Sequence, residues 1–244
     1  MGLISFIIIL LLWQWAAQGY TSVILPSAIE VALALKTLLW EGRVMSAVGA
    51  TVFHALTGFG VAVIAGGLLG SLAGTQRRIK QALNPIATAL LGTPPIAWLV
   101  LAMVWFGLGA TNSIFTVAVT VSPILFTASA ETISALDPRL LAVAQVYQMQ
   151  GKVLFQSLYV PHLLSQLLPV MVTGLGLSWR VAIMSEVLAT PNGIGAELNI
   201  ARANLDTAQV MAWIVITIIL VLTSDTLLRQ LQKRLLPWTS NSNQ

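Results

Sequence analysis

The residues of this sequence that could do chemistry are a few ionisable side chains inside long apolar runs. Arg180 and Glu186 both fall within the run 163–189. An ionisable group at membrane depth costs about 3 kcal/mol or more, so it usually faces a partner or a wet cavity. Residues six apart on a helix project about 240° from each other, so these two cannot pair on one face. We therefore expect Arg180, Glu186 and the neighbouring Trp179 to line a pathway or contact a solute.

A structural role is the alternative for each of these charges. Arg180 could bond backbone carbonyls or Glu186 of another subunit, and Glu186, closer to the outer surface, could serve packing or a gate. Asp225 precedes Arg229 by four residues, a spacing that favours a local ion pair.

Catalytic chemistry finds little support. Ser185 beside Glu186 is the one pairing of a nucleophile with an acid at membrane depth. Adjacent helical residues point about 100° apart, so these two cannot form a nucleophile and base pair directly. His54 and His162 lack metal-ligand neighbours at helical spacing, and the chain has no cysteine. We expect no catalytic residue and no metal site.

The composition places these residues in a membrane protein. Of the 244 residues, 57% are hydrophobic and 8% are charged, whereas about a quarter of a soluble domain is charged. The net charge of +4 comes from short basic clusters between apolar runs, without the aromatic-interleaved surface that binds nucleic acid. We therefore predict lipid as the surroundings and no nucleic-acid partner.

The apolar windows predict an all-α polytopic membrane protein with about six transmembrane helices in a single domain, residues 1–244. A spanning helix needs about 20 predominantly apolar residues. The windows lie at about 2–17, 46–73, 84–106, 112–133, 163–189 and 208–228. Between the first two, a moderately apolar helix from Pro26 to the neighbourhood of Gly42 is expected along the membrane interface.

Basic residues predict the orientation, because Lys and Arg near span ends are retained in the cytoplasm. With both termini cytoplasmic, eight basic residues fall inside and three outside. The inner set is Arg77, Arg78, Lys80, Arg139, Lys152, Arg229, Lys233 and Arg234, and the outer set is Lys36, Arg43 and Arg202.

Two windows carry features of their own. In the third, Pro94 and Pro95 should break the helix, and the freed carbonyls must then be covered by protein or face a wet cavity, which makes both prolines pathway candidates. In the second, small residues share one helical face and predict close helix packing, within one subunit or at a dimer interface or pathway. They are Gly58, Ala62, Gly66, Gly70 and Gly74.

The 31 residues from Glu131 to Pro161 are too long for an ordinary connection. Asp137 and Pro138 start a helix, Gly151 interrupts the pattern, and an amphipathic pattern resumes up to Pro161. We predict two short helices at about 137–160, meeting at a bend below the membrane. Their exposed apolar edge would mark a partner site that enters a groove on another protein.

The outer segment 190–206 carries turn residues at Pro191, Asn192 and Gly193, followed by a short helical run. It is expected to be either a re-entrant or lid segment or an ordinary outer connection.

Several stretches of the chain together carry a family resemblance. The longest is RLLAVAQVYQMQGKVLFQSLYVPHLLSQLLPVMVTGLGLSWR, and the others are LPS, GTPPIAWLVLAMVWFGLG, GLGLSWRVAIMSEVLATPNGIG, and the close at Asp225, Arg229 and LLPW. In this order they resemble the permease subunits of binding-protein-dependent ABC importers, in the branch that imports nitrate, sulfonates, taurine and related small molecules. The longest stretch is similar to the coupling-helix segment of those permeases.

The resemblance has departures. The family's acidic residue falls on Ala142 and its glycine on Gln148, while its alanine remains at Ala144. The glycine's bend would then have to form elsewhere, for example at Gly151. His54 stands where the family commonly carries an arginine.

The resemblance implies a type I ABC importer permease fold in the bacterial inner membrane, with two copies enclosing one pathway. The coupling-helix hairpin of each copy would seat in a cleft of an ATPase subunit through Ala142, Ala144, Tyr147, Gln148, Gly151 and Pro161. Because the chain lacks a GxxxxGK[ST] phosphate loop, ATP and Mg²⁺ would be bound by that partner and this chain would need no cofactor.

An extracytoplasmic binding protein would deliver the solute, for which Arg180 favours a small anion such as nitrate, a sulfonate, taurine or bicarbonate. The alternatives are a permease for a thiamine-precursor-like solute and an ion-coupled secondary carrier. Such carriers usually contain repeated broken helices.

Overall fold

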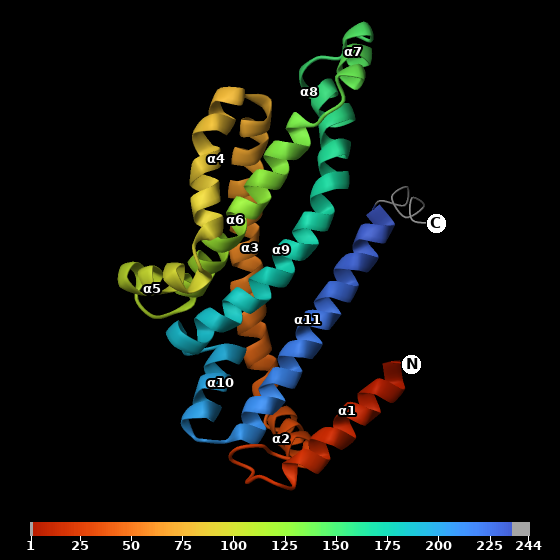
Figure 1. Cartoon of the computed structure of the whole chain (residues 1–244). Helices are drawn as coiled ribbons and strands as arrows, with labels where there is room; N and C mark the ends of the chain where they lie inside the picture. The colour runs from red at the N-terminus through yellow and green to blue at the C-terminus, as the bar shows by residue number, and fades with distance from the viewer. Residues whose placement is uncertain (1, 236–244) are drawn as a thin grey trace.

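A computed structural model describes residues 2–235, and these form a long bundle of helices (Figure 1). Within that part of the chain there is no strand. The helices are α1 (Gly2–Ala17), α2 (Ala28–Trp40), α3 (Arg43–Thr75), α4 (Arg77–Gly92), α5 (Pro95–Phe106), α6 (Ala110–Ser134), α7 (Pro138–Val146), α8 (Gly151–Leu154), the π-helical turn η1 (Phe155–Tyr159), α9 (Val160–Ala189), α10 (Ile194–Ala203) and α11 (Thr207–Leu235).

Helices α3 and α6 pack along their lengths through the small residues of α3. A Cβ atom at Gly66 would lie 2.4 Å from the Ser122 carbonyl oxygen, and one at Gly70 would lie 2.3 Å from that of Phe126. Side chains at these positions would push the two backbones apart. The predicted close packing is confirmed, and its partner is a helix of the same subunit.

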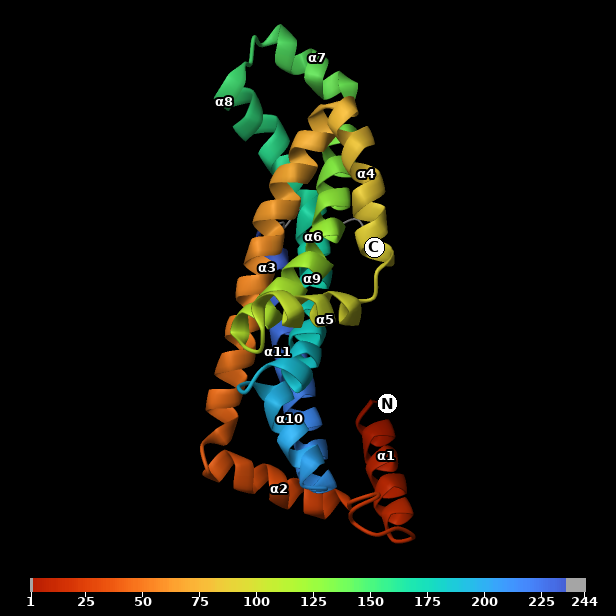
Figure 2. The ribbon, with the colours of Figure 1, turned by 90° about the vertical axis from the view of Figure 1, so that its left-hand side faces the viewer.

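The third apolar window, 84–106, is broken at Pro94 and Pro95 as the sequence predicts, so the window does not form one straight span. It is divided between α4 and α5, whose axes differ by 96°. Pro94 and Pro95 cause the break, because proline supplies no backbone N–H to continue the hydrogen-bond ladder. Figure 2 shows α5 lying across the bundle while α4 runs alongside it.

The first window differs from the prediction. Helix α1 has 16 residues, or about 24 Å of length, which falls short of a hydrocarbon core of about 30 Å. It lies in the lower part of the molecule, beside the α2 end (Figures 1 and 2). Among the described residues four helices are long and apolar enough to cross a membrane, or five if α4 and α5 count as one broken span, instead of the six expected.

Helix α2 lies across one end of the bundle, nearly perpendicular to α3 (Figure 2). Ser27 and Glu30 form a capping box at its start, and the Trp13 indole donates to the Pro26 carbonyl over 3.0 Å. This geometry agrees with a helix along the membrane interface.

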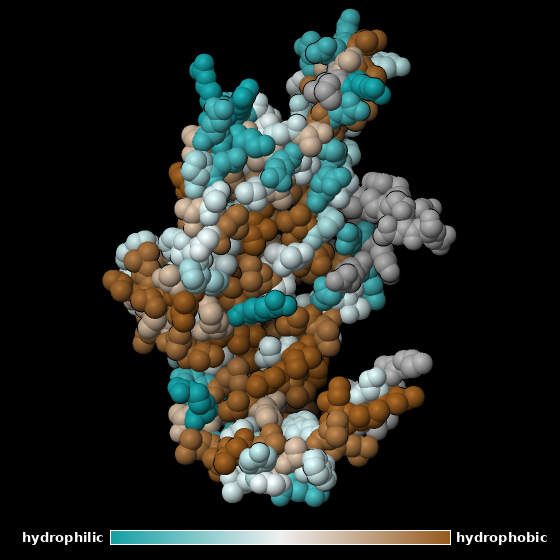
Figure 3. Space-filling view, viewed as in Figure 1, coloured by the Kyte–Doolittle hydropathy of each residue, from teal (hydrophilic) through white to brown (hydrophobic). Residues whose placement is uncertain are grey.

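The surface has the polarity of a membrane protein. In Figure 3 hydrophobic residues cover the middle of the bundle, while hydrophilic residues gather over the turn between α3 and α4 and around α7 and α8. The basic residues Arg77, Arg78, Lys80, Arg139 and Lys152 belong to this end. We call it the α7 end, and the other the α10 end.

Candidate functional site

Arg180 lines a cleft of about 520 Å³ between α9 and α11. Its side chain is exposed, and Gly176, one helical turn before it, leaves open space beside it. The cleft is lined by Val172, Thr173, Gly176, Leu177 and Arg180 from α9 and by Val221, Leu222, Ser224, Asp225 and Leu228 from α11.

The charges of this cleft come from Arg180 and Asp225. Guanidinium groups bind planar oxyanions through parallel N–H donors. The Thr173 and Ser224 hydroxyls donate to carbonyls of their own helices, Pro169 and Val221, so they offer acceptors to the cleft. A solute with an anionic group would therefore find its donors on Arg180.

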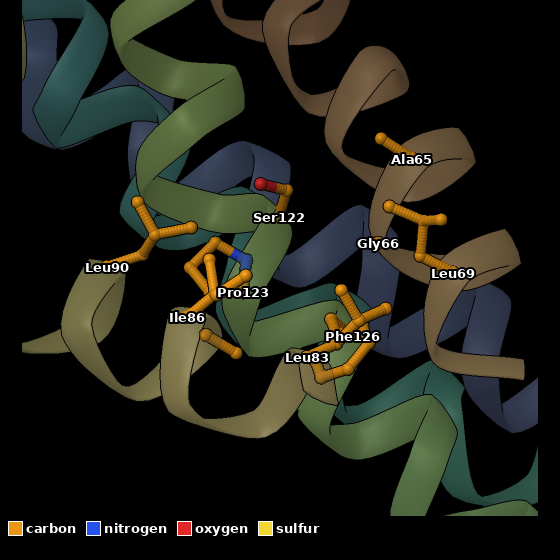
Figure 4. A pocket seen from close by; sticks show the side chains of 10 residues that line it. Ala65, Gly66, Leu69, Leu83, Ile86, Leu90, Ser122, Pro123 and Phe126 are labelled. Atoms are coloured by element: carbon orange, nitrogen blue, oxygen red, sulfur yellow. The ribbon is translucent and has the colours of Figure 1, made fainter. Parts of the chain in front are cut away.

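A second hollow is an apolar pocket of about 110 Å³ between α3, α4 and α6. Figure 4 shows Leu83, Ile86 and Leu90 of α4 facing Pro123 and Phe126 of α6, with Ala65 and Leu69 on α3. No charged side chain lines this pocket, so it has no cationic group that could bind an anion.

Glu186 is buried in a polar cluster near the α10 end. The residue is 1% exposed, and its carboxylate has partners from α3 and α10. One oxygen accepts from the Thr51 hydroxyl (2.7 Å) and from the Gly195 backbone N–H (3.0 Å). The other lies 2.8 Å from Nδ1 of His54. We refer to Thr51, His54 and Glu186 as the α10 cluster.

A neighbouring set of hydroxyl and amide groups ties α6 to the end of α9. Ser113 donates to Ser185 over 2.9 Å, and Ser185 donates to the side-chain oxygen of Asn112 over 3.2 Å. Ser185 therefore does not contact Glu186 as a nucleophile contacts a base. In the part of the chain that the structure describes, no group of three possible metal ligands occurs.

Helices α7 and α8 project beyond the bundle at the α7 end (Figures 1 and 2). The Asp137 carboxylate caps α7 by accepting from the Arg139 N–H over 2.8 Å. Val146 and Tyr147 are 81% and 72% exposed, and Phe155 is 52% exposed. Ala142, Gln148, Gly151 and Pro161 are also exposed, whereas Ala144 is buried.

Comparison with known proteins finds a family match over most of the chain. Residues 62–240 match the sequence pattern of the binding-protein-dependent transport system inner membrane component. This chain belongs to that family.

Its relatives include transport permeases of named solutes. Similar proteins are the taurine permease TauC of Escherichia coli (30% identity over 178 residues, 72% of this chain and 64% of the relative), the riboflavin permease RibX of Chloroflexus aurantiacus (30% over 241 residues, 98% and 90%), and the nitrate import permease NrtB of Synechocystis (28% over 204 residues, 79% and 73%).

Solved structures show the same fold. A chain of an amino acid ABC transporter crystallised with histidines has a TM-score of 0.68 at 17% identity, covering 82% of this permease and 97% of that chain. A chain of an inward-facing methionine ABC transporter gives 0.55 at 13% identity, covering 73% and 93%. The predicted all-α type I importer permease fold is confirmed.

The hairpin of this permease corrects two expectations. A bend forms at Gly151, whose φ is +52°, as expected, but the chain also bends at Gln148, whose φ is +51°, where no bend was expected. The second helix is not a separate unit, because α8, η1 and α9 continue without a break into the fifth window. At η1 the Val160 N–H bonds to the Phe155 carbonyl five residues back, a π-type turn that accommodates Pro161.

The remaining predicted site residues are dispersed in the permease. Trp179 is 3% exposed and packs in the apolar core of α3, α6 and α9, and both carboxylate oxygens of Glu186 already have partners within the permease. Pro94 and Pro95 stand at the break between α4 and α5, and neither lines the Arg180 cleft. Of this set, Arg180 alone lines a described cleft.

Sequence reasoning missed the contact between His54 and Glu186, which are 132 positions apart. It considered Glu186 as a partner of Arg180 in another subunit, whereas the partners lie within the same permease. The available signal was that the family commonly carries a basic residue at position 54, inside an apolar span, while Glu186 is an acid inside another.

Proposed function

We propose that this permease is the membrane subunit of an ATP-driven importer in which two copies enclose one pathway for a small anion. Nitrate, a sulfonate such as taurine, and bicarbonate are the candidate solutes. The observation that carries the proposal is the hairpin of α7 and α8, which stands clear of the bundle with large apolar side chains exposed.

The hairpin supports ATP-driven transport because exposed apolar side chains on a short helix usually serve a partner's groove. Val146 and Tyr147 lie at its tip, close to the basic residues that favour a cytoplasmic location. An ATPase subunit binding ATP and Mg²⁺ would hold this tip and transmit its closure through the continuous helix from Gly151 to Ala189.

Helix α5 supports the second copy. It lies across the bundle and exposes apolar side chains, among them Val100, Val104 and Trp105 at 55%, 77% and 58%. The break before it leaves carbonyl groups of α4 without helical partners, which hydrocarbon cannot satisfy. A second permease copy with a wet pathway between the two would cover both features.

Arg180 supports an anion as the solute. It is a cation within a membrane-spanning helix, and it lines the largest of the described clefts. Among the described side chains, no carboxylate lies within 4 Å of its guanidinium to form a salt bridge. An extracytoplasmic binding protein would deliver the solute to the α10 end, and both termini would lie in the cytoplasm of a bacterium. Residues 236–244, which include the predicted cytoplasmic C-terminus, lie outside the described residues.

The test is ATPase stimulation in lipid vesicles that hold permease, ATPase subunit and binding protein. Nitrate, bicarbonate, taurine, an alkanesulfonate and riboflavin are compared as solutes. Arg180→Ala should raise the anion concentration for half-maximal stimulation by on the order of tenfold or more, because a charged hydrogen-bond donor is lost. Arg180→Lys should retain part of the affinity.

Arg78→Ala is the matched control, since it removes an exposed arginine at the α7 end and should leave stimulation unchanged. Stimulation by riboflavin alone, or an unchanged response of Arg180→Ala, would reject the anion. Solute uptake by the permease without any ATPase subunit would instead establish the secondary carrier.

A further inference from the structure

Helix α10 is attached to the bundle by polar contacts at its N-terminus. The first N–H groups of a helix have no partner within the helix. In α10 the Ile194 N–H donates to the Thr51 hydroxyl over 2.9 Å, and the Gly195 N–H donates to Glu186 over 3.0 Å. Both acceptors belong to the α10 cluster, so α3 and α9 together supply the cap of α10.

The side chains of the α10 cluster are buried, so their polar groups need hydrogen-bond partners within the protein. Thr51, His54 and Glu186 are 0%, 3% and 1% exposed. A buried carboxylate is strongly unfavourable unless charges or donors satisfy it. Here the donors are the Thr51 hydroxyl, the Gly195 N–H and His54, while the positive end of the α10 dipole points at the carboxylate.

The turn that leads into α10 is built around the same carboxylate. Gly193 has φ of +114°, and a Cβ atom there would lie 2.3 Å from the Glu186 carboxyl carbon. Further along, Arg43 at the start of α3 forms a salt bridge with Glu197 of α10. The helix is thus held to α3 at two places, and turns at residues 190–193 and 204–206 join it to α9 and α11.

Such an attachment suits an element that moves. The α3–α6 contact is backbone packing that water cannot replace, whereas water can take over the hydrogen bonds of a helix N-terminus. We propose that Glu186 is a positioning residue that, with Thr51 and His54, latches α10 across the outer end of the pathway. The latch rests on the proposed function, because opening of that end is a step of import.

The consequence is a helix whose N-terminus is held by one buried hydroxyl and one carboxylate, while the Arg43–Glu197 salt bridge holds it further along. With the latch closed, α10 packs on α3, α9 and α11, and Ala201 on its inner side is 2% exposed. With the latch broken, α10 pivots about its two turns and Ala201 meets water. Glu186 then loses its α10 donor and keeps Thr51 and His54.

A single cysteine reports this opening, because the natural chain contains none. Ala201→Cys is placed in the permease–ATPase complex in lipid nanodiscs, and its labelling by a small water-soluble maleimide is timed. Ala73→Cys, in a buried alanine of α3 near the α7 end that is 1% exposed, is the matched reporter of general loosening.

The informative pair of second substitutions is Thr51→Val and Thr51→Ser. Valine keeps the shape of threonine but removes the hydroxyl that both donates to Glu186 and accepts from Ile194, whereas serine keeps that hydroxyl. Thr51→Val and the isosteric Glu186→Gln should speed labelling of the Ala201→Cys variant by on the order of tenfold, since each weakens the buried hydrogen bonds that hold the N-terminus of α10. Thr51→Ser should keep the slow rate of the chain with Thr51. The Ala73→Cys variant should label slowly in all backgrounds.

Equal labelling rates of Ala201→Cys in the Thr51→Val and Thr51→Ser backgrounds would overturn the latch. So would an equal acceleration of labelling in Ala73→Cys and Ala201→Cys. The same labelling on the permease alone in nanodiscs separates the proposals. Slow, Thr51-dependent labelling there supports the latch even if no ATPase binds, in which case the importer assignment fails by itself.

Discussion

At the scale of single residues, the bend between α7 and α8 depends on the backbone conformation of Gln148. Gln148 adopts φ of +51°, a region that costs about 1 kcal/mol or more for a residue with a side chain. The hairpin therefore retains the bend of its family although the glycine is absent. Neither sequence spacing nor composition indicates that a glutamine will accept this conformation.

Gln148→Gly should tighten the hairpin, because glycine adopts positive φ without that cost. Trypsin can report the change, since Arg139 and Lys152 are exposed on either side of the bend. We expect cleavage at these sites to slow by a few-fold, consistent with about 1 kcal/mol. Gln145→Gly is the control, because glycine inside α7 should accelerate cleavage; equal effects of the two glycines would contradict this account.

Gly193→Ala tests the turn before α10. A methyl group there would overlap the Glu186 carboxylate and force a φ of +114° on alanine, so we expect a loss of about 2–3 kcal/mol of stability. Thermal unfolding in detergent measures the loss. Gly49→Ala, where nothing lies within 4 Å of the added methyl, should be neutral or slightly stabilising, and a similar loss at both glycines would refute the close approach.

At the scale of the elements, the sequence predicted those features that depend only on neighbouring residues in the chain. The apolar windows predicted α3, α6, α9 and α11, and the paired prolines predicted the break before α5. The angle of that break and the π-type turn at η1 depend on neighbouring helices, so sequence reasoning missed both. The contact of His54 with Glu186 joins helices far apart in the chain, and no helical spacing could reveal it.

The start of α2 gives a pH-dependent prediction. The backbone N–H of Ser27 and the hydroxyls of Ser22 and Ser27 donate to Glu30, and these hydrogen bonds hold the pKa of Glu30 below its ordinary value. The stabilisation from charged Glu30 is then full above the unfolded-state pKa of about 4.3, and it is lost as pH falls through the lower folded pKa.

Glu30→Gln should accordingly lower the unfolding temperature at neutral pH, and the difference from the natural chain should shrink as the pH falls below about 4. Glu41→Gln, an exposed glutamate just after α2, is the control. A difference for Glu30→Gln that stays constant across this pH range would exclude the charged capping box as its cause.

At the scale of the whole molecule, the chain is a bundle with specialised ends. The α7 end carries basic residues and a projecting hairpin, and the α10 end carries a short helix held by buried polar groups. The continuous helix from Gly151 through Ala189 joins the two ends and places Arg180 between them. Under the proposed function, movement of the hairpin would be transmitted to the cleft and the α10 cluster along this helix.

Co-purification of the ATPase subunit with the permease tests the central claim, that the hairpin is where a nucleotide-hydrolysing partner acts. Tyr147→Glu puts a charge on the exposed apolar tip, and Tyr20→Glu makes the same change at an exposed tyrosine near the opposite end. We predict that the natural chain and Tyr20→Glu retain the ATPase while Tyr147→Glu loses it. Undiminished ATPase recovery with Tyr147→Glu would contradict the account.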